Sequence, residues 1–236
     1  YNFPALRQQL SQAGENFVSH SDTEVILKLY ARYGKTCVNY LRGMFAFAVW
    51  DNERRELFLT RDRLGIKPLY YHIDAGRVVF ASEVRAIISS GLVTPRIDRM
   101  ALSDFLTYQS VPAPRTLVEG IQTLLPGHWM KVNRTGEVSS GEYWNLLHNR
   151  SEAAAMATKS EALHRISELL REAIAMHLIS DVPLGVFLSG GIDSSVLVAL
   201  MRELGHTPQT FSVVFGESSY DESGHARQIA QRFQTA

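Results

Sequence analysis

The sequence predicts two domains in series, an α+β domain followed by an α/β domain. Three observations support this prediction. Short β-type runs separated by polar turns fill the first part of the chain, a polar and Ala-rich segment without clear periodicity follows, and the remainder alternates strand, helix, strand and helix. We therefore expect a first domain at residues 1–145, a linker at residues 146–160 and a second domain at residues 161–236.

The first domain is expected to open with an amphipathic helix and to continue as hairpins. Apolar residues recur at helical spacing from Val25 to Tyr33, and Asp22 and Thr23 are suited to cap the helix start. The short intervals between the strands favour antiparallel pairing, because a parallel crossover needs about a dozen residues or more. Helices are expected at 22–33, 83–89 and 99–108, and strands at 43–50, 56–61, 68–72, 77–82, 127–132 and 137–144.

The second domain is expected to be a doubly wound parallel sheet. Residues 182–188 form a nearly continuous apolar run, which is typical of a buried parallel strand. A strand at 210–215 and helices at 163–177, 194–204 and 222–233 complete the pattern. This spacing is that of a parallel α/β unit, so further strands are expected beyond Ala236.

Composition excludes several classes of protein. The 236 residues include 24 Lys plus Arg and 24 Asp plus Glu, so nothing favours nucleic acid as a main partner. The longest apolar stretches fall far short of the roughly 20 residues that span a bilayer. One cysteine forms no internal disulfide, and the N-terminus has no signal pattern, so we expect a cytoplasmic protein. The chain begins with Tyr1 and stops soon after a helical run, and we expect a fragment at both ends.

The sharpest motif is Leu188-Ser189-Gly190-Gly191-Ile192-Asp193-Ser194-Ser195, placed where a strand turns into a helix. The two glycines let the backbone approach a ligand closely, and the N–H groups of the turn and helix start form an anion cradle. The serines add hydroxyl donors, whereas Asp193 suits a Mg²⁺ ion. The alternative interpretation is a capped helix after a Gly turn. The Walker loop is excluded, because its Gly-Lys-Ser/Thr ending is absent.

This motif resembles the pyrophosphate loop, Ser-Gly-Gly-x-Asp-Ser, of the N-type ATP pyrophosphatases. In that family the loop holds the β,γ-phosphates of ATP, which leave as pyrophosphate when an oxygen nucleophile attacks the α-phosphorus. The resemblance implies that Leu188 and Val213 contact the adenine and ribose side of ATP and that Asp193 binds Mg²⁺. The ATP-binding residues that it implies are Leu188, Ser189, Gly190, Gly191, Asp193, Ser194, Ser195 and Val213.

Three segments of the first domain look like the class II glutamine amidotransferase domain, namely Arg42–Ala48, Arg61–Tyr71 and Phe80–Glu83. In this order with the Ser-Gly-Gly loop, they resemble the glutamine-hydrolysing asparagine synthetase family over nearly the whole chain. The resemblance implies a truncated Ntn-hydrolase-like antiparallel sandwich followed by the start of an ATP pyrophosphatase domain. It also implies ammonia release from glutamine, then amidation of aspartate through an acyl-adenylate. The expected partners are glutamine, aspartate and ATP, with neither nucleic acid nor membrane, and a homodimer is allowed.

The family's N-terminal cysteine nucleophile and its Asn-Gly-Glu segment have no counterpart in this sequence. The resemblance therefore implies that no glutaminase catalytic residue lies in these residues, and we expect the chain alone to be inactive. Cys37 has no nearby His or free amine, which favours a packing residue. Asp22 matches the family's carboxylate for the glutamine α-ammonium group, although it also suits a helix N-cap.

Two charged segments have competing interpretations. We expect Arg61-Asp62-Arg63 to be a structural turn with internal ion pairs rather than a substrate contact. The Tyr220–Ser223 segment resembles the family's start of the last helix, where Ser or Asp caps it, and a contact to nucleotide is the lesser alternative. At the level of function, two alternatives stay open: a related synthetase that amidates or cyclises another carboxylate, and a non-catalytic remnant that binds ATP or a partner. The eight histidines show no metal-ligand spacing.

Overall fold

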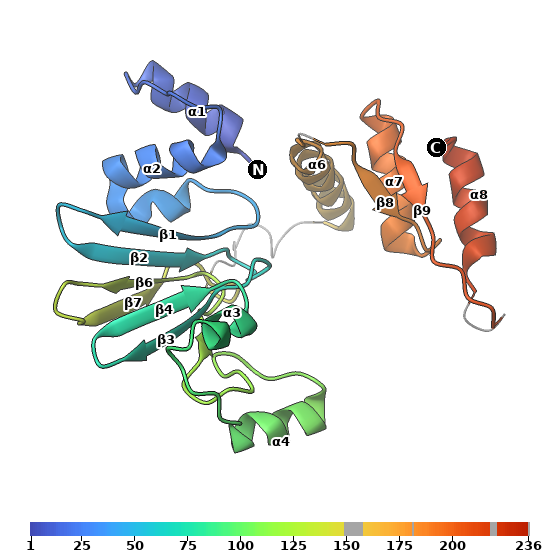
Figure 1. Cartoon of the computed structure of the whole chain (residues 1–236). Coiled ribbons are helices and arrows are strands. Elements are labelled where there is room, and N and C mark those ends of the chain that lie inside the picture. The colour runs from blue at the N-terminus through green and yellow to red at the C-terminus, as the bar shows by residue number, and fades with distance from the viewer. Residues whose placement is uncertain (149–157, 181, 218–220, 236) are drawn as a thin grey trace. The chain divides into compact units, whose positions relative to one another are not determined.

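Residues 1–148, 158–180, 182–217 and 221–235 are described by the computed structural model, in which the chain divides into two units, Tyr1–Arg150 and Ser151–Ala236 (Figure 1). Two antiparallel sheets form the centre of the first unit. One sheet has the order β1-β2-β6-β7 and the other β4-β3-β5. The strands are β1 (Ala46–Asp51), β2 (Glu56–Arg61), β3 (Tyr70–Asp74), β4 (Arg77–Ala81), β5 (Gln122–Thr123), β6 (His128–Val132) and β7 (Val138–Glu142). The antiparallel pairing expected from the short intervals is confirmed.

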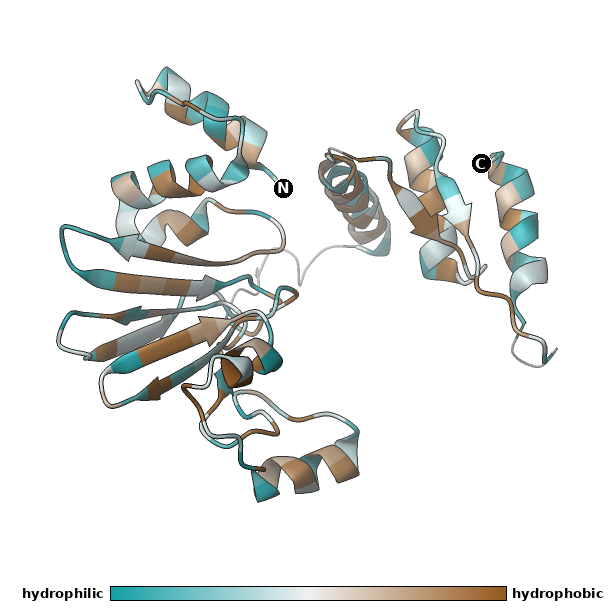
Figure 2. Cartoon of the chain, in the orientation of Figure 1, coloured by the Kyte–Doolittle hydropathy of each residue, from teal (hydrophilic) through white to brown (hydrophobic). Residues whose placement is uncertain are grey.

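A shared hydrophobic cluster joins the two sheets. Leu59 and Met130 come from the first sheet, and partly buried Tyr71 and Ile73 come from the second. Figure 2 shows hydrophobic residues along the strands and hydrophilic residues at the hairpin turns. This distribution is the one expected when the sheets bury one face each and expose their turns.

The helices of the first unit are α1 (Phe3–Gln12), α2 (Asp22–Tyr33), the 3₁₀ helix η1 (Gly34–Asn39), α3 (Val84–Ser89) and α4 (Arg99–Tyr108). Helices α1 and α2 lie side by side over the β1–β2 sheet (Figure 1), because Leu6, Leu29 and Phe58 belong to one buried cluster. Helix α1 was not expected from the sequence. It is mostly polar, and its buried residues are only Leu6 and Leu10, so its apolar periodicity is weak.

The described elements of the second unit are α6 (Lys159–His177), β8 (Gly185–Phe187), α7 (Ile192–Glu203), β9 (Gln209–Phe211) and α8 (Ser223–Phe233). Strands β8 and β9 pair in parallel, with Val186 opposite Thr210 and helix α7 between them in the chain. Two clusters bury the contacts around α7. One contains Ile174 and Met201, and the other contains Leu188 and Ala226.

The structure corrects three expectations in this unit. Helix α6 begins at Lys159, inside the segment expected to be a linker, because Thr158 and Glu161 form a capping box. Residues 149–157 of the expected linker lie outside the described residues. The strand expected at 182–188 is shorter, and Phe187 is 80% exposed, so the prediction of a buried strand is wrong there. Among the described residues β8 has β9 as its neighbour, and the strand expected at 210–215 likewise ends at Phe211.

Candidate nucleotide and glutamine sites

The Ser-Gly-Gly turn lies at the carboxyl end of β8 and is held from both sides. Leu188, which is 2% exposed, donates its backbone N–H to the carbonyl of Phe211 at 2.8 Å. Gly190 has φ of +85°, and a Cβ atom there would lie 2.6 Å from Cβ of His225. Only glycine accommodates both that backbone angle and that approach. The turn is thereby fixed against the first residues of α8.

Hydroxyl groups bridge the turn to the first turn of α7. Oγ of Ser189 and Oγ of Ser194 are 3.1 Å apart, and Ser194 also accepts the backbone N–H of Ser189 at 3.3 Å. The N–H of Gly191 donates to Oγ of Ser189 at 3.2 Å. These contacts tie the two ends of the motif together and give the loop a defined shape.

The start of α7 has no side-chain cap, because its N-cap residue is Gly191. The first N–H groups of a helix have no partner within the helix, so those of the first turn remain available to an anion. Asp193 is exposed in this first turn, whereas the buried Oγ of Ser195 has no hydrogen-bond partner among the described atoms. This donor set fits a phosphate chain and does not fit a fully capped helix start.

A pocket of about 280 Å³ opens beside the turn, at the carboxyl ends of β8 and β9. It brings together Leu188, Ser189 and Val213 of the residues expected to bind ATP. The remaining expected residues lie in the turn and the start of α7 rather than in the pocket lining, namely Gly190, Gly191, Asp193, Ser194 and Ser195. Ligands of open α/β sheets commonly bind at this edge.

The pocket also contains four residues that were not assigned from the sequence, namely Phe187, Phe211, Ser212 and Phe215. Glu222, from the segment for which a nucleotide contact was the lesser alternative, lines it as well. Ser212 donates from Oγ to the carbonyl of Leu188 at 2.6 Å and so fixes the two strand ends together. These residues are distant from one another in sequence, and only the parallel pairing of β8 and β9 indicates that they share a pocket.

No cluster of three or more His, Cys, Asp or Glu side chains suited to a metal ion occurs in the described ranges. A structural metal cage is therefore not found in that part of the chain. Mg²⁺ in nucleotide sites is commonly held by one or two carboxylates together with substrate phosphates. The single exposed carboxylate of Asp193, next to an uncapped helix start, fits that kind of binding.

In the first unit, Asp22 occupies the first position of α2 and is exposed. The N-cap is Ser21, whose Oγ accepts the N–H of Thr23 at 3.1 Å, so the interpretation of Asp22 as the cap is wrong. Oδ1 of Asp22 accepts a hydrogen bond from Oγ of Ser21 at 3.4 Å, and the carboxylate is exposed at the start of α2.

The Arg61–Arg63 segment is a structural turn, as expected. The Asp62 side chain is 2% exposed and accepts backbone N–H groups of Phe45, Leu64, Ile66 and Lys67 at 2.9 to 3.3 Å. Arg61 donates to the carbonyls of Gly65, Lys67 and Leu124 at 2.5 to 2.8 Å. The expectation of internal ion pairs is wrong, because the two side chains hold the turn through hydrogen bonds to the backbone.

Cys37 is fully buried in η1, and burial raises the pKa of its thiol to about 12. A protonated, inaccessible thiol is a poor nucleophile, which confirms the interpretation of Cys37 as a packing residue.

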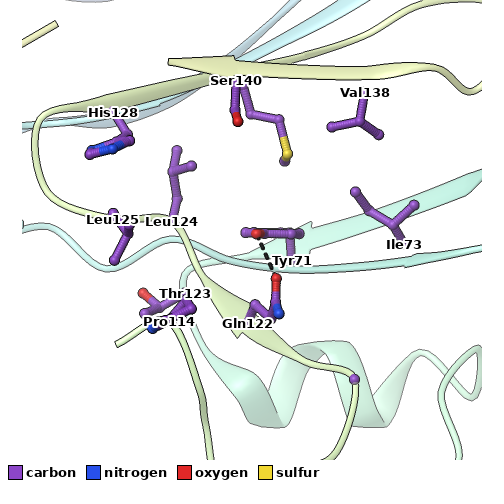
Figure 3. A pocket seen from close by; sticks show the side chains of 12 residues that line it. Tyr71, Ile73, Pro114, Gln122, Thr123, Leu124, Leu125, His128, Val138 and Ser140 are labelled. Carbon is purple, nitrogen blue, oxygen red and sulfur yellow. Dashed lines mark hydrogen bonds between the residues drawn. The ribbon is translucent and has the colours of Figure 1, made fainter. Parts of the chain in front are cut away.

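A further pocket of about 550 Å³ lies between the two sheets of the first unit (Figure 3). Tyr71 and Gln122 face it from one side, joined by a hydrogen bond of 2.8 Å, and His128 and Ser140 face it from the other. None of the expected site residues lines this pocket, and its lining contains no carboxylate, amine or thiol. Within the described part of the chain, no helix is both long and apolar enough to cross a membrane.

Comparison with known proteins agrees with the two motifs. Residues 1–144 match the family model "Glutamine amidotransferase domain", and residues 165–236 match the model "Asparagine synthase". The chain is 34% identical over 231 residues to asparagine synthetase [glutamine-hydrolyzing] 1 of Bacillus subtilis, covering 98% of this chain and 36% of that protein. It is 31% identical over 245 residues to amidase chry2 of Gibberella zeae, with 98% and 36% covered.

A solved glutamine phosphoribosylpyrophosphate amidotransferase from B. subtilis, complexed with ADP and GMP, gives a TM-score of 0.45 at 21% identity, covering 89% of this chain and 43% of that chain. The chain spans about a third of the length of the curated relatives named above. The family models and the relatives agree over both units. The chain therefore belongs to the asparagine synthetase family, with residues 1–144 matching the glutamine amidotransferase domain and residues 165–236 matching the asparagine synthase model.

Proposed function

We propose that the complete protein amidates the side-chain carboxylate of aspartate with nitrogen from glutamine, using ATP. A carboxylate oxygen attacks the α-phosphorus, the bond from that phosphorus to the bridging oxygen breaks, and pyrophosphate leaves. Ammonia released from glutamine then attacks the acyl carbon of the adenylate, so that the C–N bond of asparagine forms and AMP departs. The second unit would perform the adenylation and the first would serve glutamine.

The observation that carries this proposal is the uncapped start of α7 beside the pocket at the ends of β8 and β9. N–H donors that are already oriented stabilise charge on a leaving group without reorganising during the reaction. The β,γ-phosphates would lie on the turn between Ser189 and Ser195, and the nucleoside would lie toward Leu188 and Val213. The exposed aromatic rings of the pocket support a planar ligand at that end.

Asp193 would hold Mg²⁺ together with phosphate oxygens. When bound, the ion supplies neutralisation of the charge that builds on the departing pyrophosphate. The carboxylate itself repels phosphate, and a cation between the two groups would offset that repulsion. The Asp193 side chain makes no hydrogen bond or ion pair within the described residues, which leaves both of its oxygens available.

Asp22 would bind the α-ammonium group of glutamine. Its exposure at the start of α2, where Ser21 serves as the N-cap, supports this role. We expect Asp22→Asn in the complete protein to weaken glutamine-dependent synthesis by about tenfold or more, because a charge-assisted contact contributes about 1.5 to 3 kcal/mol. Synthesis from free ammonia should be unchanged. Equal loss with both nitrogen sources would assign Asp22 to the fold instead.

A second candidate is a synthetase that amidates or cyclises a different carboxylate. The relative named an amidase, at nearly the same identity and coverage as the asparagine synthetase, favours keeping this candidate. A third candidate, a non-catalytic remnant, would bind ATP or a partner without turnover.

One experiment separates the three. The complete protein is incubated with labelled pyrophosphate, ATP and Mg²⁺, with aspartate or with a panel of other carboxylates. Exchange of label into ATP that depends on aspartate supports the proposal. Exchange with a different carboxylate alone supports the second candidate, and ATP binding without exchange for any carboxylate supports the third.

A further inference from the structure

We propose that Glu222 binds the ribose hydroxyls of ATP and makes the pocket selective for ribonucleotides over 2′-deoxyribonucleotides. This inference rests on the proposed function of the same pocket and assigns a role to a residue outside the loop motif. Its starting point is that Glu222, at the start of α8, lines the pocket together with Ser189 and Val213.

The Glu222 side chain does not stabilise the start of α8. Glu222 occupies the N-cap position but makes no side-chain capping bond. The neighbouring Asp221 caps the helix instead, since its two oxygens accept the N–H and the Oγ hydroxyl of Ser223 at 3.0 and 2.9 Å. Within the described residues, the Glu222 carboxylate forms neither a hydrogen bond nor an ion pair, and the residue is exposed. A helix start needs one such cap, so a second carboxylate at the pocket wall calls for another explanation.

The chemistry of the lining indicates which part of a nucleotide Glu222 would meet. Of the described residues in the lining, Glu222 alone carries a charge, and a carboxylate repels phosphates. Phe187, Phe211 and Phe215 offer exposed ring surface, which suits a base. With the phosphates excluded and the base assigned to the aromatic rings, the ribose is the part of ATP left to contact Glu222. Its two adjacent hydroxyls can each donate a hydrogen bond to one carboxylate.

The position in the fold supports the same assignment. Glu222 follows the second of two parallel strands, whereas the phosphate-binding turn follows the first. In dinucleotide-binding α/β folds, an acidic residue after the second strand binds the ribose 2′-hydroxyl for the same reason: the carboxylate faces the sugar when the phosphates lie at the first helix start.

The test compares ATP with 2′-deoxyATP in the complete protein, by aspartate-dependent pyrophosphate exchange and by direct binding in isothermal titration calorimetry with Mg²⁺. Wild-type protein should prefer ATP by about tenfold or more in kcat/KM, the effect of one hydrogen bond to a charged group. Glu222→Ala should raise KM for ATP more than KM for 2′-deoxyATP, because 2′-deoxyATP has only its 3′-hydroxyl to lose as a partner of Glu222. The preference for ATP should fall to about twofold, with kcat nearly unchanged.

Glu217→Ala is the matched control, because Glu217 is also an exposed glutamate after β9 but does not line the pocket. It should retain the wild-type preference. If Glu222 had only a structural role, Glu222→Ala would lower the affinities for ATP and for 2′-deoxyATP by the same factor. That result, or an unchanged preference for ATP in Glu222→Ala, would overturn the inference.

A failure of the proposed function gives a different result. Wild-type protein would then show no pyrophosphate exchange, while calorimetry would still measure the affinities for ATP and 2′-deoxyATP. No preference in binding would also overturn the assignment of Glu222.

Discussion

Cys37 shows how burial decides whether a reactive residue can act. It is the single cysteine of the chain, it is fully buried, and its thiol has a pKa of about 12. Because the thiolate is the reactive species, we expect no alkylation of the folded chain by iodoacetamide at pH 8 and complete alkylation in urea. Mass spectrometry measures both. Rapid labelling of the folded chain, or glutamine hydrolysis that Cys37→Ser abolishes, would contradict this assignment.

Glu24 shows that a half-buried carboxylate near the surface can also be strongly perturbed. Its pKa is lowered from the ordinary value of 4.5 to about 2, first by the hydroxyl of Ser19 and then by the N–H groups of Val18 and Ser19. The three bonds measure 2.6 to 2.9 Å and hold residues 18–19 against the first turn of α2, near Asp22. The negative charge of Glu24 therefore orders the segment that leads to a predicted substrate contact.

A carboxylate whose folded-state pKa is depressed stabilises the fold above its unfolded pKa and loses that contribution as the pH falls through the folded pKa. The difference in free energy of unfolding between wild type and Glu24→Gln should therefore be constant above about pH 5 and shrink as the pH falls toward 2. Carboxyl-carbon NMR should give a Glu24 titration midpoint near 2. A midpoint at the ordinary value would show that the three hydrogen bonds do not persist in solution.

At the scale of elements, the junction between α7 and α8 depends on Gly190. A Cβ atom there would lie 2.6 Å from Cβ of His225 and 2.8 Å from N of Ala226. Gly205 is a matched control, because it has the same φ of +85° but no atom within 4 Å of its Cβ position. Alanine at either site carries the left-handed backbone cost of about 1 to 2 kcal/mol.

We expect Gly190→Ala to lower the free energy of unfolding by about 1 to 3 kcal/mol more than Gly205→Ala, because only the former forces atoms apart. Urea denaturation measures this difference. Gly190→Ala should also weaken ATP binding, since the displaced turn carries the proposed phosphate donors, whereas Gly205→Ala should bind ATP normally. Equal effects of the two substitutions would mean that the turn and α8 are not in close contact.

The elements differ in how far the sequence predicts them. The bounds of α2 and α4 are those expected, and a side chain caps the start of each helix: Asp98 for α4, and Ser21 for α2, where the sequence suggested Asp22. Strands β8 and β9 are shorter than their apolar runs, because residues such as Val213 and Phe215 line a pocket instead of continuing a ladder. An apolar run in the sequence shows that a segment is hydrophobic, but not whether another strand or helix packs against it. Burial at these positions depends on tertiary contacts that periodicity does not encode.

The candidate site divides in the same way. The contiguous motif by itself predicts a turn at Ser189 and Gly190, since the strand end, the glycines and the helix start all lie within eight residues. Glu222 and Phe211 come from other elements, and pairing of β8 with β9 brings them to the same pocket. The hydrogen bonds that Asp62 accepts from four backbone amides likewise depend on how the chain folds around it. Because the sequence does not reveal them, the adjacent charges suggested ion pairs instead.

At the scale of the whole molecule, each unit has a core of its own. Leu29 and Phe58 belong to a cluster formed within the first unit, whereas Ile174 and Leu188 belong to clusters formed within the second. Substitutions in separate cores rarely interact energetically. The two proposed half-reactions should therefore be separable by single substitutions, with Asp22 affecting only the use of glutamine and Asp193 affecting only adenylation.

Asp193→Asn tests that separation most directly. The change is nearly isosteric at an exposed helical position, so the thermal melt of the complete protein should be unchanged. Aspartate-dependent pyrophosphate exchange should fall by about 10²- to 10³-fold, because preorganised contacts to a leaving group are commonly worth about 2.7 to 4 kcal/mol. Glutaminase activity should persist, since we propose that chemistry for the other unit. If exchange continues near the wild-type rate in a variant that melts normally, the turn from Ser189 to Ser195 is only a helix start, and the proposed adenylation loses its main support.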